Sequence, residues 1–230
     1  MSIYVIGDTH LSLSADKKMD VFPGWEDYVF RLEKNWRALV KPEDTVIVAG
    51  DISWALRLND VTEDLRFLDS LPGQKIILKG NHDYWWQTKK KLDEFIEANG
   101  FSTLKILFNN AYAVEDKVIC GSRGWFFDDD EGTDRKVINR EAGRLKMSIE
   151  EGLKITDDKD KLIVFLHYPP VTLLQKCDEI MDVLKEYGIK RCFYGHLHGP
   201  SLKGAVNGIV DGTDFHLVSA DYLGFCPKLV

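Results

Sequence analysis

The stretch KIILKGNHD, residues 75–83, starts as an apolar strand and ends in Asn81, His82 and Asp83 directly behind a glycine. Taken alone, Asn and Asp after Gly most often form a turn, because they tolerate left-handed backbone and hydrogen-bond their own main chain. Four other stretches repeat the arrangement: IYVIGDTH (3–10), TVIVAGD (45–51), KLIVFLHYPP (161–170) and RCFYGHLH (191–198). Each is a short apolar strand followed at once by polar residues, which indicates a shared site at the strand ends.

Helical patterns lie between these strands. The clearest covers residues 25–40, where apolar residues recur on one face at helical spacing: Trp25, Val29, Leu32, Trp36 and Leu39. Short apolar strands that alternate with helices indicate a sheet covered on both faces, with ligands outside the carboxyl ends of its strands. Residues 104–122 and the stretch after Pro200 predict hairpin strands of a second, more antiparallel sheet. We therefore predict an α/β fold, a two-sheet sandwich between helices, as one domain over residues 1–230.

Composition restricts the class of protein. Hydrophobic residues make up 44% of the 230-residue chain, and no apolar run approaches the roughly 18 residues of a membrane span. The opening MSIYVIGD lacks the basic region and cleavage site of a signal peptide, so we expect a cytoplasmic protein. The four cysteines show no C-x-x-C spacing. With a net charge of −7, the chain does not attract nucleic acid or anionic lipid as a whole, and an anionic substrate requires a local positive centre.

Five of the six histidines stand at the strand ends: His10, His82, His167, His196 and His198. A lone histidine on an apolar segment is usually a hydrogen-bonded core residue. Five at one edge, together with Asp8, Asp51 and Asn81, most often indicate a metal site. Imidazole, carboxylate and amide oxygen together suit borderline divalent ions such as Mn, Fe, Co, Ni or Zn.

The candidate ligands are too many for one tetrahedral ion, so two ions are the simpler count. Two divalent ions about 4 Å apart repel by on the order of 16 kcal/mol at an effective dielectric constant near 20, so an anion must lie between them. A carboxylate can bridge two ions where imidazole cannot, and Asp51 is the natural bridging residue. With a bridging hydroxide as second anion, the site keeps a formal charge of about +1 and can capture an anion. We therefore infer a phosphate ester as substrate, attacked by the metal-activated hydroxide.

The motifs GDTH, GD at residues 50–51, GNHD, His167 and GHLH resemble those of the calcineurin-like metallophosphoesterases. The resemblance implies a four-layer αββα sandwich of two mixed sheets between helices, with a dinuclear metal centre at the strand ends. It assigns one metal to Asp8, His10, Asp51 and His198, and the other to Asp51, Asn81, His167 and His196. It also gives His82 a catalytic role, either contact with the phosphate or protonation of the leaving group.

The second motif, GDISWA, differs from that of one branch of this superfamily. Protein Ser/Thr phosphatases of this superfamily extend the second motif with a further Asp and an Arg, whereas this chain reads GDISWA, with Trp54 and Ala55 in those places. The pattern is more similar to bacterial phosphodiesterases and small phosphohydrolases, including class III cyclic nucleotide phosphodiesterases. The stretches SWA, GNHDYWW and SADYL are also similar to those of a bacterial subgroup of these enzymes.

Three further residues are candidates for substrate contact. Trp54 and Trp85 follow ligand motifs and could line a pocket for a base or an aromatic leaving group, although core packing is the competing interpretation. Arg123 follows another strand and could bind phosphate, with a structural ion pair as the alternative. The acidic run DDDE at residues 128–131 lacks neighbouring histidines and predicts a solvated loop.

The sequence thus predicts a metal-dependent hydrolase of a phosphate ester, whose substrate is a small molecule or nucleotide. An alternative is a non-catalytic metal-binding interaction module on the same fold, although such a module could lose ligands and here all are present. A nuclease is a further alternative, but it would need a basic groove or an extra DNA-binding domain. Neither a membrane nor a nucleic-acid partner is expected. Spacing does not separate phosphomonoester from phosphodiester, and it predicts no oligomeric state.

Overall fold

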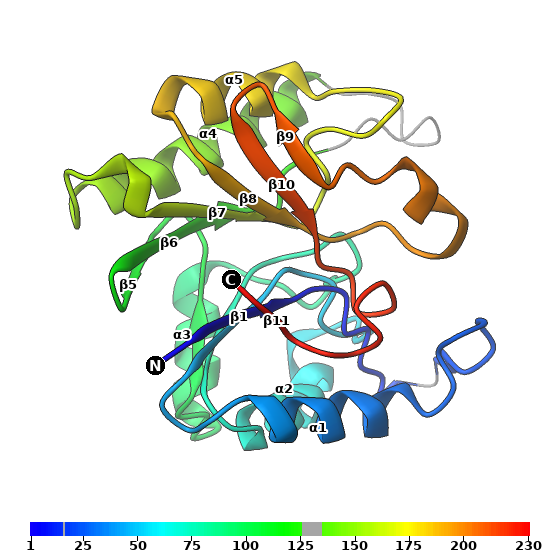
Figure 1. Cartoon of the computed structure of the whole chain (residues 1–230). Coiled ribbons are helices and arrows are strands. Elements are labelled where there is room, and N and C mark those ends of the chain that lie inside the picture. Colours follow the sequence, from blue (N-terminus) through cyan, green and yellow to red (C-terminus); the bar gives the residue numbers. More distant parts are fainter. Residues whose placement is uncertain (16, 126–134) are drawn as a thin grey trace.

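The computed structural model describes residues 1–15, 17–125 and 135–230, in which two β-sheets lie face to face between layers of helices (Figure 1). The first sheet has the strand order β11-β1-β2-β3-β4. Strands β1 to β4 run parallel, and β11 pairs antiparallel with β1. The strands are β1 (Ile3–Ile6), β2 (Thr45–Val48), β3 (Gln74–Ile77), β4 (Leu104–Ile106) and β11 (Lys228–Leu229).

The second sheet has the strand order β5-β6-β7-β8-β10-β9. Its strands are β5 (Tyr112–Val114), β6 (Lys117–Ser122), β7 (Leu162–Leu166), β8 (Arg191–Tyr194), β9 (Gly208–Val210) and β10 (Thr213–Leu217). The central strands run parallel, and only the edge strands β5 and β9 pair antiparallel. The predicted hairpins are confirmed, because β5 pairs antiparallel with β6 and β9 with β10, and they make this sheet the more antiparallel of the two. Strands β7 and β8 also lie in this sheet, where β7 pairs parallel with β6 and β8 with β10.

Helices cover the outer faces of both sheets (Figure 1). On the first sheet lie α1 (Tyr28–Leu39), α2 (Thr62–Ser70) and α3 (Lys89–Ala98), and on the second lie α4 (Arg135–Leu153) and α5 (Asp178–Tyr187). Short 3-10 turns complete the chain: η1 (Leu58–Val61), η2 (Lys159–Lys161) and η3 (Gly199–Gly204). This arrangement confirms the predicted α/β sandwich of two mixed sheets flanked by helices.

A layer of buried apolar side chains joins the two sheets. It includes Val5 and Ile47 from the first sheet and Phe165 and Phe193 from the second. The rings of Phe165 and Phe193 stack with centroids 5.2 Å apart and an interplanar angle of 12°. Because both sheets bury one face here and the other under helices, their strands read as continuous apolar runs. This packing brings the carboxyl ends of the parallel strands of both sheets to one side.

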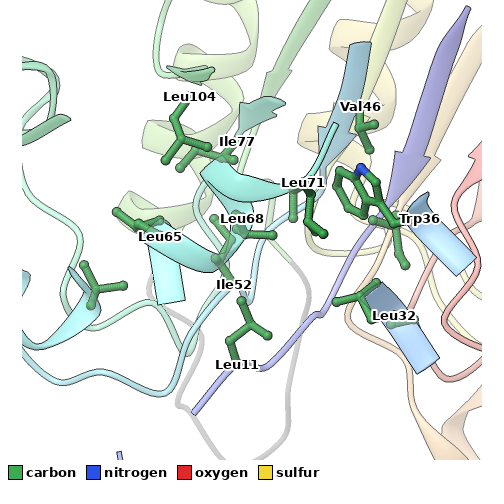
Figure 2. Packing of buried hydrophobic residues seen from close by; sticks show 14 of the residues in the cluster. Leu11, Leu32, Trp36, Val46, Ile52, Leu65, Leu68, Leu71, Ile77 and Leu104 are labelled. Carbon is green, nitrogen blue, oxygen red and sulfur yellow. The ribbon is translucent and has the colours of Figure 1, made fainter. Parts of the chain in front are cut away.

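The core between α1 and the first sheet is built around Trp36, which lies near Val46 and Leu71 (Figure 2). Its indole N–H donates to the Pro72 carbonyl oxygen at 2.9 Å, so the buried ring leaves no unpaired donor. The helix begins at Tyr28, later than predicted. Leu39, predicted on the buried face, is 41% exposed in the last turn of the helix, and the following Val40 is buried in its place.

Two further predictions concern a membrane span and an acidic loop. Within the described residues, no helix is long and apolar enough to cross a membrane. The acidic run at residues 128–131 lies outside the described residues.

Candidate metal centre

The polar residues behind β1, β2, β7 and β8 meet where the two sheets come together. Backbone hydrogen bonds join these loops directly: the Asp8 N–H donates to the Gly50 carbonyl at 2.8 Å, and the His10 N–H to the Asp51 carbonyl at 2.9 Å. In the second sheet, the Gly195 N–H donates to the His167 carbonyl at 3.0 Å. These bonds join the loops within each sheet, and the His196 N–H, which donates to the Asp8 carboxylate at 3.0 Å, links the two sheets.

Several of these residues adopt the left-handed backbone conformation that L side chains rarely occupy. The φ angle is 59° at Asp8, 44° at His10, 49° at Asp51 and 74° at His196. Such strain costs on the order of 1–3 kcal/mol per residue and is found mainly at functional sites. It turns the chain sharply behind each strand, so that successive side chains point back across the strand ends.

Two glycines allow the loops to approach one another closely. A Cβ atom on Gly80 would collide with the backbone nitrogen and the Oδ1 of Asp51. A Cβ atom on Gly195 would collide with Oδ2 of Asp8. The glycines of GNHD and GHLH are thus required by the space that two carboxylates occupy.

The structure brings the predicted ligands together in two groups. The first group consists of Asp8, His10 and His198, whose ligand atoms lie within 4.8 Å of one another. Within this group, Nε2 of His198 lies 3.4 Å from Oδ1 of Asp8.

The second group consists of Asp51, His167 and His196, again with ligand atoms within 4.8 Å of one another. Asn81 completes it: its Oδ1 lies 2.6 Å from Nε2 of His167 and 3.0 Å from Nδ1 of His196. The other ring nitrogen of His167 lies 3.2 Å from the Ala49 carbonyl oxygen, so that Nε2 is the nitrogen directed into the site. All seven residues predicted as ligands therefore lie in one cluster.

Asp51, a member of the second group, also faces the first group. Its Oδ2 is 3.6 Å from Nε2 of His10, and its Oδ1 is 3.6 Å from Nε2 of His167. The carboxyl is 1% exposed. Burial, together with the neighbouring carboxylates of Asp83 and Asp8, raises the pKa of Asp51 well above its usual value. Cations bound beside these buried carboxylates would stabilise their charged form.

The donor set fits divalent metal ions. Nε2 of His198, which faces Asp8, is buried without a hydrogen-bond partner, which is costly unless another ligand occupies it. Burial lowers the pKa of His10 and of His167, so both present neutral imidazole, the form that ligates metals. Burial likewise lowers the pKa of His196 to about 4.

His198 differs from these three histidines. Burial alone would lower its pKa, but the carboxylates of Asp8 and Asp221 outweigh this effect and raise the pKa to about 10. A metal ion at this position would therefore displace a proton from His198.

His82 lies at the rim of the cluster, with its side chain 33% exposed. Its backbone N–H donates to Oδ1 of Asp51 at 2.8 Å, and its Nε2 lies 4.0 Å from Oδ2 of Asp51. Burial lowers the pKa of His82, an effect that Asp8 opposes. The imidazole thus faces both the carboxylate cluster and solvent, which is where a substrate would enter.

The three candidate substrate contacts lie in different surroundings. Trp54 is half-buried and stacks on His10, with centroids 5.0 Å apart and an interplanar angle of 20°. Trp85 does not line the site: it is fully buried, and its indole N–H donates to Asp83 at 3.0 Å because the ring packs beneath the GNHD loop. Arg123 lies with its Nη2 3.4 Å from a carboxylate oxygen of buried Glu141.

Residues outside the recognised motifs also contact the cluster. The ring of Tyr168 lies 4.4 Å from that of His196, and the ring of Trp25 lies 5.7 Å from that of His10. Asp221 contacts His198, with Oδ1 2.8 Å from Nδ1. The helical spacing predicts Trp25 only as a core residue, and no ligand motif includes Asp221. The SADYL stretch holds the one sequence signal for Asp221, but no spacing links it to GHLH.

Solved structures resemble this chain in fold. A search of curated protein sequences finds no significant match. Among solved structures, a protein of unknown function from Aquifex aeolicus is similar at 18% identity, with a TM-score of 0.53, covering 99% of this chain and 95% of its own. The phosphopantetheinyl hydrolase of Mycobacterium tuberculosis is similar at 17% identity, with a TM-score of 0.55, covering 100% of this chain and 95% of its own.

These structural likenesses establish the fold. The family is established by sequence, because the model of the calcineurin-like phosphoesterases matches residues 1–200, which include all the ligand motifs. The chain therefore belongs to the calcineurin-like phosphoesterase family and is a metal-dependent hydrolase.

Proposed function

We propose that this chain hydrolyses a phosphate ester of a small molecule or nucleotide at a dinuclear metal centre. The first ion would be held by Asp8, His10, Asp51 and His198, and the second by Asp51, Asn81, His167 and His196. The observation that carries the proposal is the position of Asp51, whose two carboxylate oxygens face one histidine of each group at 3.6 Å. A carboxylate can serve two ions at once, whereas an imidazole in this position could not.

When bound, two divalent ions would polarise the phosphoryl oxygens and lower the pKa of a water molecule until it can act as a nucleophile near neutral pH. The chain itself supplies binding and orientation. The left-handed turns at Asp8 and Asp51 and the close approach of Gly80 hold the carboxylates in place without the substrate. Preorganisation of this kind reduces the rearrangement needed during the reaction.

His82 is the proposed catalytic residue. Its lowered pKa makes the neutral imidazole the main form near pH 7, with one ring N–H available as a donor. Its Nε2 faces the carboxylate cluster, 4.0 Å from Oδ2 of Asp51, and the side chain is partly open to solvent, so this nitrogen is the one placed to meet a substrate oxygen. We assign His82 a hydrogen bond to the phosphoryl or leaving-group oxygen.

The first experiment removes metal from the purified protein and restores Mn²⁺. Hydrolysis of p-nitrophenyl phosphate is then compared with that of bis-p-nitrophenyl phosphate, with Asp51→Asn as the control. We expect Mn²⁺-dependent turnover in the wild type and its loss in Asp51→Asn, because an amide carries no charge to hold two cations together. Preference for the diester would indicate a phosphodiesterase, and preference for the monoester a phosphomonoesterase. Absence of metal-dependent turnover with both substrates would contradict the proposal.

A further inference from the structure

The carboxylate of Asp221 lies directly behind the metal-ligand candidate His198. Its Oδ1 accepts a hydrogen bond from Nδ1 of His198 at 2.8 Å, and its Oδ2 accepts one from the Gly199 N–H at 3.2 Å. The Asp221 side chain is 10% exposed. One carboxylate therefore holds both the imidazole and the backbone that follows it.

This contact determines which nitrogen of His198 faces the cluster. Because Nδ1 carries the proton donated to Asp221, the lone pair of the neutral ring is on Nε2. Nε2 is buried without a hydrogen-bond partner and lies 3.4 Å from Oδ1 of Asp8. A carboxylate that holds the far nitrogen of a histidine ligand fixes its tautomer and raises its basicity toward the metal.

Asp221 is itself anchored to the strand that carries Asp8. The Ala220 N–H donates to the Gly7 carbonyl at 3.0 Å, and Ser219 forms a parallel bridge with Gly7. On its other side, Phe225 is buried against Trp25, with ring centroids 5.0 Å apart. The segment that bears Asp221 is thus held in register with the loop that bears Asp8.

The second group of ligands has different supports. Nδ1 of His167 lies against the Ala49 carbonyl oxygen at 3.2 Å, and Nδ1 of His196 faces Oδ1 of Asn81 at 3.0 Å. The contacts of Asp221 with the ligand loops are made to His198 and Gly199. Residue 221 also lies beyond residues 1–200 matched by the family model.

We propose that Asp221 is a positioning residue that orients His198 and thereby sets the metal affinity of the first group alone: Asp8, His10 and His198. The inference rests on the proposed dinuclear centre. This role of Asp221 makes residues beyond the family motifs part of the metal site, because the SADYL segment holds the ligand His198 in place.

The test is calorimetric titration of Mn²⁺ into metal-free protein, with thermal unfolding of each metal-free variant. The variants are Asp221→Ala and Asp221→Asn, with Asp214→Ala as the matched control. Asp214 also pairs with a histidine, His216, at 3.1 Å, but it lies beside the first residue of β8, at the end of the strand away from the cluster.

We expect the wild type and Asp214→Ala to bind two ions. Asp221→Ala should bind one ion with wild-type affinity and the other about 10–100-fold more weakly. This is the usual loss of metal affinity when a residue that orients a metal ligand is removed. Asp221→Asn should lose less, because the amide oxygen still accepts the hydrogen bond from Nδ1 of His198.

Two results would overturn the inference. One is two ions bound to Asp221→Ala with wild-type affinity. The other is an equal loss of Mn²⁺ affinity at both sites together with a lower unfolding temperature of the metal-free protein. A purely structural role of Asp221 would produce this second result. A wild type that binds fewer than two ions would instead contradict the proposed dinuclear centre. Failure of the positioning role and failure of the proposed function thus give different titrations.

Discussion

The indole of Trp54 packs against the imidazole of His82, with ring centroids 4.4 Å apart and an interplanar angle of 43°. Trp54 follows the GD motif at the place where the protein phosphatases of this superfamily carry an aspartate. The proposed catalytic histidine is thus held by an aromatic face instead of a carboxylate. An aromatic neighbour adds to burial and supplies no charge to stabilise a protonated ring, in line with the lowered pKa of His82.

Replacing Trp54 by alanine should lower kcat by about tenfold or more, because His82 loses the surface that orients it. Trp54→Phe should retain most activity, since a ring remains in the same place. The Mn²⁺ stoichiometry of both variants should stay at the wild-type value. Steady-state kinetics and metal titration check this prediction. A Trp54→Ala variant with a lower melting temperature but unchanged kcat and KM would show that Trp54 only packs the core.

Replacing His82 by alanine should reduce kcat by about 10²–10⁴-fold, the usual contribution of a positioned proton donor or acceptor. Metal content should not change, because His82 belongs to neither ligand group. Turnover measured alongside elemental analysis of the same preparation separates the two effects. If activity survives unchanged with full metal content, His82 has no place in the mechanism.

Gly80→Ala should disrupt the metal centre, because the new methyl group would occupy the space of the Asp51 backbone nitrogen and Oδ1. Overpacking of this kind costs about 1–3 kcal/mol, and here it displaces the proposed bridging residue. Gly143→Ala is the matched control, since its Cβ would meet no atom within 4 Å and alanine favours the helix. We expect loss of Mn²⁺ binding in Gly80→Ala and wild-type binding in Gly143→Ala. Equal binding by both variants would contradict the packing argument.

Lys75 predicts a pH dependence of stability away from the metal centre. Its buried ammonium donates to the carbonyl oxygens of Leu71 at 2.5 Å and Gly73 at 2.9 Å. Burial lowers its pKa from 10.5 to about 8, an effect that Asp69 opposes. Between pH 8 and 10.5 the unfolded chain therefore binds more protons at this residue than the folded chain. The contribution of Lys75 to the free energy of unfolding must then rise with pH across this window.

Urea unfolding of the wild type and Lys75→Met at pH 7.5, 8.5 and 9.5 tests this sign. The stability difference should move in favour of the wild type as pH rises, by less than about 1.4 kcal/mol per pH unit, the limit for one proton. A difference that is constant over the range would mean that Lys75 keeps its proton in the folded state.

The sequence alone predicted the sandwich and the identity of the cluster residues. An apolar run followed by Asp, Asn or His is a local pattern, and strand ends are set by local backbone chemistry. The sequence did not predict which of the two sheets each strand joins. Strands β7 and β8 have the same apolar pattern as β1 but pair in the other sheet. Strand pairing depends on contacts between distant segments, which the apolar pattern of one strand does not encode.

The same division applies to the site. The types and order of the ligands came from motifs within four residues of the end of each strand, and the structure brings those seven side chains together. Tertiary structure alone decided what supports the site residues: Trp54 packs against the proposed catalytic His82, and Asp221 lies behind the ligand His198. It also placed Trp85 in the core, although its sequence position beside GNHD suggested a pocket. Ligand chemistry is set by residue type at a strand end, whereas orientation and burial are set by packing of segments far apart in the chain.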